Sequence, residues 1–318
     1  MEITFLGTSS GVPTRSRNVS SVALRLPQRG EMWLLDCGEG TQHQLLRSDL
    51  KPSQIRRIFI THMHGDHIFG LPGLLASCGL SGMGSPIDVY GPPELADYLQ
   101  TCSKHARINW GNRVRVHAVA TGTVYEDSEF SVSCRPLAHS VPTFGYRIAE
   151  KDRPGRFKPE KASALGIPPG PIYGRLKCGE TVTLPNGRRI RGTDLREPDE
   201  PGRKIAYCTD TIYCDAALEL AQDADALIHE ATFAHQDAQL AFERQHATST
   251  MAAQVALGAG VRQLILTHFS PRYAPGNPLQ LEDLRQEAQA IFPNTTLACD
   301  FWRYAVPRRP ARQLAGHR

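Results

Sequence analysis

A cluster of histidines and an aspartate follows a short apolar run near residue 60. The run covers residues 58–60, and the next positions hold His62, His64, Asp66 and His67 in the pattern His-x-His-x-Asp-His. An apolar run of this kind is typical of a buried strand, so these side chains stand where a strand ends. Imidazole nitrogens and carboxylate oxygens are ligands of zinc and related ions. The stretch therefore indicates a metal site rather than a polar loop that happens to be rich in histidine.

Polar residues follow other apolar runs in the same way. Asp36, His139, Asp210 and His268 each come just after a run that predicts a strand. One strand ending in a histidine would mean little, but several in succession imply that one edge of a sheet gathers them. Short strands separated by helical segments favour an α/β sandwich over a helical bundle. The patterns predict strands at residues 2–6, 19–26, 32–35, 55–60, 87–90, 114–119, 130–137, 204–210, 226–230 and 263–267, and helices at 41–47, 73–80, 93–105, 249–257 and 281–291.

The overall composition is that of a globular protein. With 318 residues, of which 41% are hydrophobic and 21% charged, the chain can form one large domain or two ordinary ones. Its apolar runs are far shorter than the roughly 20 residues of a membrane-spanning helix, and its first residues lack the features of a signal peptide. The eight cysteines include no Cys-x-x-Cys pair, which argues for a reducing compartment. We expect a cytoplasmic protein with no membrane partner.

One stretch, at about residues 150–200, is rich in proline, glycine and basic residues and has no convincing period. Residues 151–204 contain 13 Lys or Arg against 7 Asp or Glu, a net charge of +6 that exceeds the +4 of the whole chain. The glycines and prolines predict an extended protrusion without a core of its own. It is either a solvated insertion or a contact surface for a long polyanion. We expect a catalytic domain over residues 1–306 that contains this insertion, and a flexible basic tail over 307–318.

The series of strand-end residues resembles that of the metallo-β-lactamase superfamily over almost the whole chain. Four further segments resemble, more narrowly, the ribonuclease Z family of short-form tRNA 3′-processing endonucleases. Residues 13–18 resemble its Pro-x-Lys-x-Arg-Asn loop, with Arg15 replacing lysine, and residues 229–232 match its His-Glu-Ala-Thr box. His246 and the Ser-Thr pair shortly after it resemble a His-Ser-Thr box, with an insertion between His and Ser. Residues 170–171 match the Gly-Pro of that family's arm. The resemblance implies an αββα four-layer sandwich with an inserted protruding arm.

The resemblance also implies two zinc ions per subunit, with Mn²⁺ or Fe²⁺ as alternatives. Asp36 would not bind metal but would orient a ligand histidine by hydrogen bonding. The other histidines, at 43, 105, 117, 235 and 317, are expected to be ordinary surface or core residues. The implied ligands are His62, His64 and His139 for one ion, Asp66, His67 and His268 for the other, and Asp210 as a bridge.

The implied activity is that of a zinc-dependent endoribonuclease that removes the 3′ trailer from tRNA precursors. It would leave a 3′-hydroxyl on the tRNA and a 5′-phosphate on the trailer. A water activated by the metal ions would attack phosphorus, with Asp66 as proton acceptor. His246 would protonate the leaving 3′-oxygen, and Glu230 would orient that imidazole.

The residues expected to bind the tRNA precursor lie in the loop at 13–18 and in the basic insertion. The loop would sense the 3′ end and disfavour a mature CCA terminus, and the insertion would clamp the body of the tRNA. The candidates are Arg15, Arg17 and Asn18 in the loop, and Lys158, Lys161, Gly170, Pro171, Arg175 and Lys177 in the insertion.

Two other classes of function stay open at this point. A general phosphodiesterase or small-ester hydrolase of the same fold would share the metal ligands but would have no need of the insertion. A non-enzymatic RNA-binding module would bind tRNA without metal, which leaves seven ordered ligands without a purpose. The resemblance further implies a homodimer, and the apolar stretch at residues 70–80 is our candidate interface, although it fits an ordinary core helix equally well.

Overall fold

The computed structural model describes residues 1–81, 85–110 and 113–309. The chain forms two compact units: unit 1, with Met1–Ala149 and Lys204–Val306, and unit 2, with Glu150–Arg203 and the described residues after Val306. Unit 2 is inserted between two antiparallel neighbouring strands of unit 1, which pair Ala149 with Lys204. Each unit has an apolar core of its own.

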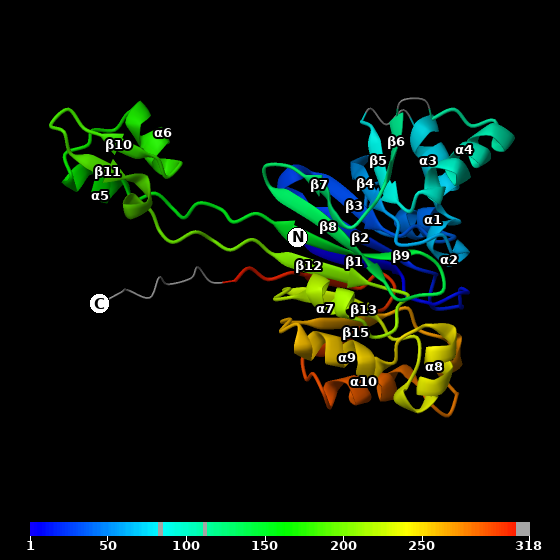
Figure 1. Cartoon of the computed structure of the whole chain (residues 1–318). Helices are drawn as coiled ribbons and strands as arrows, with labels where there is room; N and C mark the ends of the chain where they lie inside the picture. Colours follow the sequence, from blue (N-terminus) through cyan, green and yellow to red (C-terminus); the bar gives the residue numbers. More distant parts are fainter. Residues whose placement is uncertain (82–84, 111–112, 310–318) are drawn as a thin grey trace. The chain divides into compact units, whose positions relative to one another are not determined.

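Unit 1 contains two seven-stranded sheets (Figure 1). The strands of the first sheet, in spatial order, are β16 (Arg303–Ala305), β1 (Glu2–Gly7), β2 (Ser21–Leu26), β3 (Glu31–Leu35), β4 (Ile55–Phe59), β5 (Ile87–Gly91) and β6 (Val114–Ala118). Those of the second are β15 (Thr295–Leu297), β14 (Leu264–Thr267), β13 (Ala226–Glu230), β12 (Lys204–Cys208), β9 (Thr143–Glu150), β8 (Phe130–Leu137) and β7 (Gly122–Glu126). From β3 to β6, and from β12 to β15, the neighbouring strands are parallel.

Helices cover the outer face of each sheet. Those over the first sheet are α1 (Thr41–Leu46), α3 (Leu71–Leu80) and α4 (Glu94–Ala106); the short α2 (Gly65–Ile68) precedes α3. Those over the second sheet are α7 (Asp215–Ala221), α9 (Ser249–Gly258) and α10 (Leu281–Gln289), with α8 (Ala238–Arg244) before α9. Figure 1 shows the two helical layers on opposite sides of the paired sheets. The predicted αββα four-layer sandwich is confirmed.

Three apolar clusters separate these four layers. The central one lies between the sheets and takes large side chains from both, such as Trp33 and Phe59 from the first and Phe130 and Tyr146 from the second. Strand β8 shows how the sequence builds it, because its alternate residues face inward and the others stay partly exposed. The other two clusters fill the spaces between each sheet and its helices. Large apolar side chains fully removed from water in this way contribute about 1.5–3 kcal/mol each.

Side-chain caps define where two of the outer helices begin. The Thr248 hydroxyl accepts a hydrogen bond from the backbone N–H of Met251 at the start of α9. Gln280 and Asp283 form a reciprocal capping box at the start of α10. Each device satisfies amide groups that lack a partner inside the helix and stabilises it by about 1 kcal/mol.

Most predicted elements are present within one or two residues of their expected bounds, but seven elements of unit 1 were not predicted: β7, β9, β15, β16, α2, α7 and α8. In β9, Phe144, Tyr146 and Ile148 face the other sheet, whereas Gly145 lies on the face toward the helices. A side chain there would meet Leu220 of α7, since a Cβ at this position would lie 2.6 Å from Leu220 Cδ1. This glycine is thus set by helix-to-sheet packing rather than by a turn.

Unit 2 contradicts the prediction of an extended segment without a core. Its elements are α5 (Pro159–Ala164), α6 (Pro171–Lys177), the hairpin strands β10 (Thr181–Thr183) and β11 (Arg189–Arg191), and a 3₁₀ turn at Gly192–Leu195. Phe157, Leu176, Val182 and Ile190 contribute to a buried cluster between them. The prediction failed because each element is only three to seven residues long, too short for a helical or strand period to show.

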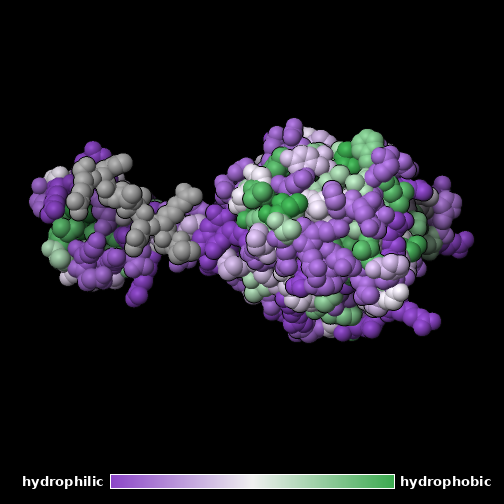
Figure 2. Space-filling view, turned by 90° about the horizontal axis from the view of Figure 1, so that it is seen from below, coloured by the Kyte–Doolittle hydropathy of each residue, from purple (hydrophilic) through white to green (hydrophobic). Residues whose placement is uncertain are grey.

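The predicted flexible tail falls mainly on residues 310–318, which lie outside the described part of the chain. In the described part, Arg308 donates a hydrogen bond to Glu150, with Nη2 2.8 Å from Oε1. Figure 2 shows that hydrophilic residues cover most of the visible face of unit 1, with hydrophobic ones in separate patches. No helix among the described residues is long and apolar enough to cross a membrane.

Candidate metal centre and active site

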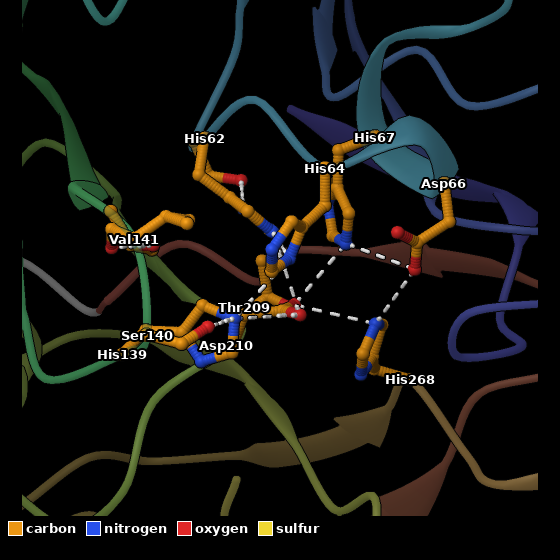
Figure 3. A network of polar contacts seen from close by, with 12 residues as sticks. His62, His64, Asp66, His67, His139, Ser140, Val141, Thr209, Asp210 and His268 are labelled. Carbon is orange, nitrogen blue, oxygen red and sulfur yellow. Dashed lines mark hydrogen bonds and ion pairs between the residues drawn. The ribbon is translucent and has the colours of Figure 1, made fainter. Parts of the chain in front are cut away.

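The predicted ligands converge where the strands of the two sheets end (Figure 3). His62, His64, Asp66 and His67 follow β4 of the first sheet. Three further ligands follow strands of the second sheet: His139 follows β8, Asp210 follows β12 and His268 follows β14. The structure brings all seven together in two groups whose ligand atoms lie within 4.8 Å of one another: His62, His64, His139 and Asp210 in one, and Asp66, His67 and His268 in the other.

Three imidazole nitrogens crowd together in the first group. His64 Nδ1 lies 3.0 Å from His62 Nε2 and 3.4 Å from His139 Nε2. The carboxylate of Asp210 lies beside them, with Oδ2 3.7 Å from His62 Nε2 and 3.9 Å from His139 Nε2. Burial and the neighbouring His67 lower the pKa of His62, so its imidazole is neutral, as a metal ligand must be.

The second group uses the other oxygen of Asp210. Oδ1 lies 3.2 Å from His67 Nε2 and 3.3 Å from His268 Nε2. Asp66 Oδ2 lies 3.4 Å from each of the same two nitrogens. One carboxylate therefore faces both groups, which is the arrangement expected of a bridging ligand.

Hydrogen bonds on the outer sides of the rings leave Nε2 of four histidines free to bind a metal. His139 Nδ1 lies 2.8 Å from the Gln245 carbonyl and His67 Nδ1 lies 2.8 Å from Asp36 Oδ2, and both partners only accept hydrogen bonds. Nδ1 of His62 and of His268 each contact a threonine hydroxyl, at 3.0 and 2.9 Å. The Thr61 hydroxyl donates its proton to Asp36 and the Thr232 hydroxyl to Glu230, so both accept from the histidine. Each Nδ1 thus carries the proton and each Nε2 keeps its lone pair.

The residues present therefore fit a pair of zinc-type ions. His67 Nε2 is fully buried and makes no hydrogen bond. Although burial opposes a charge on His67, the carboxylates of Asp210, Asp66 and Asp36 raise its pKa. The same negative charge favours a metal cation in that position. Nitrogen and carboxylate oxygen donors suit Zn²⁺, and also Mn²⁺ or Fe²⁺.

Three residues of the site adopt the left-handed backbone region, which non-glycine residues rarely occupy. Their φ angles are 59° for Asp36, 53° for Asp210 and 59° for His268. Each stands just after a strand, where the chain turns sharply so that the side chain points into the site. Such a conformation costs on the order of 1–3 kcal/mol and persists only when the surrounding structure holds it.

Asp36 occupies the predicted supporting position. It accepts hydrogen bonds from His67 Nδ1, from the Thr61 hydroxyl and backbone N–H, and from the Tyr207 hydroxyl. Sequence reasoning missed Thr61 and Tyr207. Thr61 directly precedes the histidine cluster and could have been suspected, whereas nothing in the sequence indicated that Tyr207, 171 positions away, reaches Asp36.

His246 and Glu230 form a hydrogen-bonded pair beside the ligands. His246 Nδ1 lies 3.0 Å from Glu230 Oε1 and 4.0 Å from Asp210 Oδ2. Glu230 is fully buried and also accepts hydrogen bonds from the backbone N–H of Thr211 and the hydroxyl of Thr232, each at 2.6 Å. Burial opposes protonation of His246, but Glu230 raises its pKa to about 9. The imidazole therefore carries a proton at neutral pH.

The pKa of Asp66 is held far below its usual range. Burial would raise it, but His67 and His268 overcome that effect, and the Gly11 backbone N–H donates to Oδ2 at 2.8 Å. The carboxylate is thus unprotonated, as a proton acceptor must be. The same contacts make it a weak base.

Of the three candidate RNA-binding residues in the loop at 13–18, only Arg15 is exposed. Arg17 Nη1 donates to the Ala298 carbonyl at 2.8 Å and to the Thr8 hydroxyl at 2.7 Å. The side chain of Asn18 donates to the Glu39 carbonyl at 2.7 Å, and its backbone N–H donates to Asp300 at 2.7 Å. In this structure Arg17 and Asn18 hold the loop in place, which leaves Arg15 as its free cation among the described residues.

The six candidates of the insertion all lie in unit 2. Gly170 and Pro171 begin α6, with the proline at a position where a missing N–H costs nothing. Lys161, Arg175 and Lys177 are exposed. Arg175 pairs with Glu180 at 2.8 Å, Lys177 stands over the Phe157 ring at 5.8 Å, and the half-buried Lys158 lies 3.7 Å from Glu197.

The four-layer fold and the two groups of ligands define a protein of the metallo-β-lactamase superfamily. Residues 186–269 match the family model described as a beta-lactamase superfamily domain, and residues 1–143 match that of the anti-Pycsar protein Apyc1. The metallo-beta-lactamase fold protein YhfI from Bacillus subtilis has the same fold, with a TM-score of 0.67 at 17% identity over 95% of this chain and 98% of that one.

Relatives with a higher sequence identity show the family of this chain within the superfamily. The chain is 72% identical over 309 residues to ribonuclease Z of Crocosphaera subtropica, covering 97% of this chain and 99% of that protein. It is 73% identical to ribonuclease Z of Rippkaea orientalis, covering 97% and 98%. The crystal structure of the short form of human tRNase Z matches with a TM-score of 0.70 at 32% identity, over 96% of this chain and 100% of that one. The chain belongs to the ribonuclease Z family.

Proposed function

We propose that the protein is a zinc-dependent endoribonuclease that removes the 3′ trailer from tRNA precursors. The products would be a tRNA with a 3′-hydroxyl and a trailer with a 5′-phosphate. One observation carries the proposal: in a chain 72% identical to a ribonuclease Z, the hydrogen-bonded pair of His246 and Glu230 stands beside seven convergent ligands. A hydrolase for small neutral esters would have no need of a cationic group at that position.

The ligands would hold two zinc ions per subunit, with Asp210 as the bridge. When bound, the ions would supply Lewis acidity that favours attack of water on the phosphodiester. The chain's own groups would do the rest. His246 would donate its proton to the departing 3′-oxygen, and Glu230 would keep the imidazole in the donating orientation. Asp66 would accept a hydrogen bond from the attacking water and so orient it.

The basic character of unit 2 supports a role in binding the body of the tRNA. Its exposed cations, Lys161, Arg175 and Lys177, can contact phosphates. Lys158, Gly170 and Pro171 would help to position the helices that carry these cations. Because unit 2 has its own small core, it can present these cations as a folded surface rather than as a flexible chain. Arg15 would contact the 3′ end of the RNA from the loop that Arg17 and Asn18 hold.

We further propose a cytoplasmic homodimer. All eight cysteines, which lie within the described residues, are free, as a reducing compartment requires. The candidate interface at α3 is only partly exposed. Leu71, Leu74 and Leu75 are core residues, whereas Leu80 at the end of the helix is 90% exposed. An apolar groove of about 430 Å³ between α1 and α3, with Leu46 on its wall, adds to that surface. Light scattering of wild-type and Leu46→Glu/Leu80→Glu protein tests this.

A cleavage assay tests the activity. Zinc-loaded protein should cut a tRNA precursor with a 3′ trailer directly after the discriminator nucleotide, and chelation should stop it. Protein that leaves the precursor intact but hydrolyses a β-lactam or a thioester would contradict the proposal. Binding of tRNA that is indifferent to chelator, without cleavage, would instead point to an RNA-binding module.

Deleting residues 155–190 tests the role of unit 2. The deletion should abolish tRNA cleavage while hydrolysis of a small chromogenic phosphodiester survives. Loss of both activities would contradict a specific role of unit 2 in substrate recognition.

A further inference from the structure

An exposed aromatic side chain lies beside the metal ligands and has no role in the proposed chemistry. Phe69 follows α2, the helix that carries Asp66 and His67, and 63% of it is exposed. Single exposed apolar residues are ordinary on protein surfaces. Phe69 differs because it lines the same cavity as two metal ligands.

That cavity has a volume of about 410 Å³, within the range of small-ligand sites. Its lining includes His64 and Asp66, the apolar side chains of Val12, Pro13 and Phe69, and one further carboxylate, Glu39. Val12 is itself 57% exposed. An apolar shelf thus borders the position where the reacting phosphate must lie, which is unexpected for a substrate that is charged at every phosphate.

The aromatic ring lies against Gly65, where a Cβ would stand only 2.1 Å from Phe69 Cε2. The loop that carries Val12 and Pro13 is fastened to the same helix, because the Gly11 N–H donates to Asp66 Oδ2 at 2.8 Å. A loop fastened in this way loses little conformational freedom when a planar group binds beside the ring.

On the basis of the proposed function, we infer that Phe69 is a stacking platform for the base of the first trailer nucleotide. In an in-line displacement the attacking and leaving oxygens lie on opposite sides of phosphorus. His246 marks the side of the leaving tRNA oxygen and does not line this cavity, whereas Asp66 marks the opposite side and does. The trailer is joined to phosphorus through its 5′-oxygen, which lies beside this axis, so its first nucleotide can enter the cavity next to Asp66. Stacking accepts every base, as variable trailers require.

The inference is tested by combining variants of the enzyme with variants of the substrate. The precursors carry either a normal first trailer nucleotide or an abasic one, and the enzymes are wild type, Phe69→Ala and Phe69→Tyr. Phe242→Ala is the matched control, because Phe242 is also 63% exposed but does not line the cavity. Zinc content is measured for each protein. Affinity is measured in parallel, on zinc-loaded protein, with precursors whose scissile 3′-oxygen is replaced by an uncleavable methylene group.

Phe69→Ala should lose about 5- to 150-fold in kcat/KM and in affinity on the normal precursor, the range that corresponds to one base–aromatic stack. On the abasic precursor the loss should be under about twofold, with zinc content unchanged. Phe69→Tyr should keep wild-type behaviour, and Phe242→Ala should match wild type on both substrates.

An equal loss on both precursors, or no loss on either, would overturn the stacking role. If wild-type protein binds the uncleavable precursor with this base dependence but cuts no precursor, the proposed activity fails and the subsite stands. If it cuts the precursor and Phe69→Ala shows no base dependence, the subsite fails alone. Protein that neither binds nor cuts the precursor would overturn both.

Discussion

The metal ligands of unit 1 and the cations of unit 2 stand in opposite environments. In unit 1, four of the predicted ligand histidines have Nδ1 hydrogen-bonded to a group outside the ligand set: His62, His67, His139 and His268. His62, His67, Asp210 and His268 are also buried. Lys161, Arg175 and Lys177 of unit 2 are exposed, with at most one neighbouring carboxylate or ring each.

This difference determines how each region can work. A buried polar group must have partners, so the metal site is arranged in advance and the loss of any member is severe. Exposed cations need no fixed partner and act by their number, so the loss of one is graded and depends on salt. Mutations in both units test this contrast, the most damaging ones first.

His64→Ala should reduce tRNA cleavage by more than about 10³-fold. The substitution removes one of three imidazole nitrogens that lie together in the first ligand group, and no other side chain can replace it. Bound zinc, measured by mass spectrometry of the native protein, should fall at the same time. His105→Ala, which changes an exposed histidine at the end of α4, serves as the control. Full activity of His64→Ala would remove His64 from the metal centre.

His246→Ala should reduce cleavage by about 10²- to 10⁴-fold while both metals stay bound, because it removes the proton donor and not a ligand. Glu230→Gln should give a smaller loss, since the imidazole keeps a hydrogen-bond partner but loses the charge that keeps it protonated. His246 also lies within ligand distance of Asp210 and His268. Loss of zinc from His246→Ala would therefore assign it as a ligand instead.

Asp36→Asn should weaken zinc binding by about 10- to 100-fold, because Asp36 fixes the orientation of His67 without touching the metal. Competition with a chromogenic chelator measures the affinity. Asp97→Asn, at an exposed position of α4, is the matched control. An unchanged zinc affinity would show that Asp36 is not needed to position His67.

Replacing Lys161, Arg175 and Lys177 together with glutamine should weaken tRNA binding and flatten its salt dependence, by about 0.9 in the slope for each phosphate that is no longer neutralised. Hydrolysis of a small chromogenic phosphodiester should not change. The control replaces Lys104, Arg107 and Arg135 of unit 1, which changes the net charge by the same amount. Equal effects of the two triple variants would mean that total charge matters and its location in unit 2 does not.

The smallest effect concerns Glu150, which pairs with Arg203 at 2.8 Å and Arg308 at 2.8 Å. Burial opposes its charge, but these arginines lower its pKa from 4.5 to about 2. Its contribution to stability, on the order of 2 kcal/mol, is therefore present above about pH 4.5 and lost as the pH falls toward 2. The difference between the urea midpoints of wild type and Glu150→Gln should be largest at pH 7 and shrink steadily as the pH falls from 4.5 toward 2; a difference that stays constant with pH would contradict this.

The contrast also explains how much could be predicted. Metal ligands could be found from the sequence because strand ends place them in fixed local patterns, as in the cluster from His62 to His67. Those patterns predicted the sandwich and a shared site at one sheet edge, whereas the set of seven ligands and the supporting role of Asp36 followed from the family resemblance. Unit 2 was misjudged because its elements are only three to seven residues long, so a core built around Phe157 and Leu176 leaves no periodic signal.

The ligand types, their order and the strands that carry them follow from the sequence alone, because alternation and strand-end position are local properties of the chain. The folded chain was needed to show which oxygen of Asp210 faces which group, and that Tyr207 supports Asp36. It also showed that the Arg17 side chain is hydrogen-bonded to the Ala298 carbonyl, and that the Phe69 side chain is exposed to solvent beside the ligands. These facts depend on contacts between segments far apart in the chain, which no local pattern encodes.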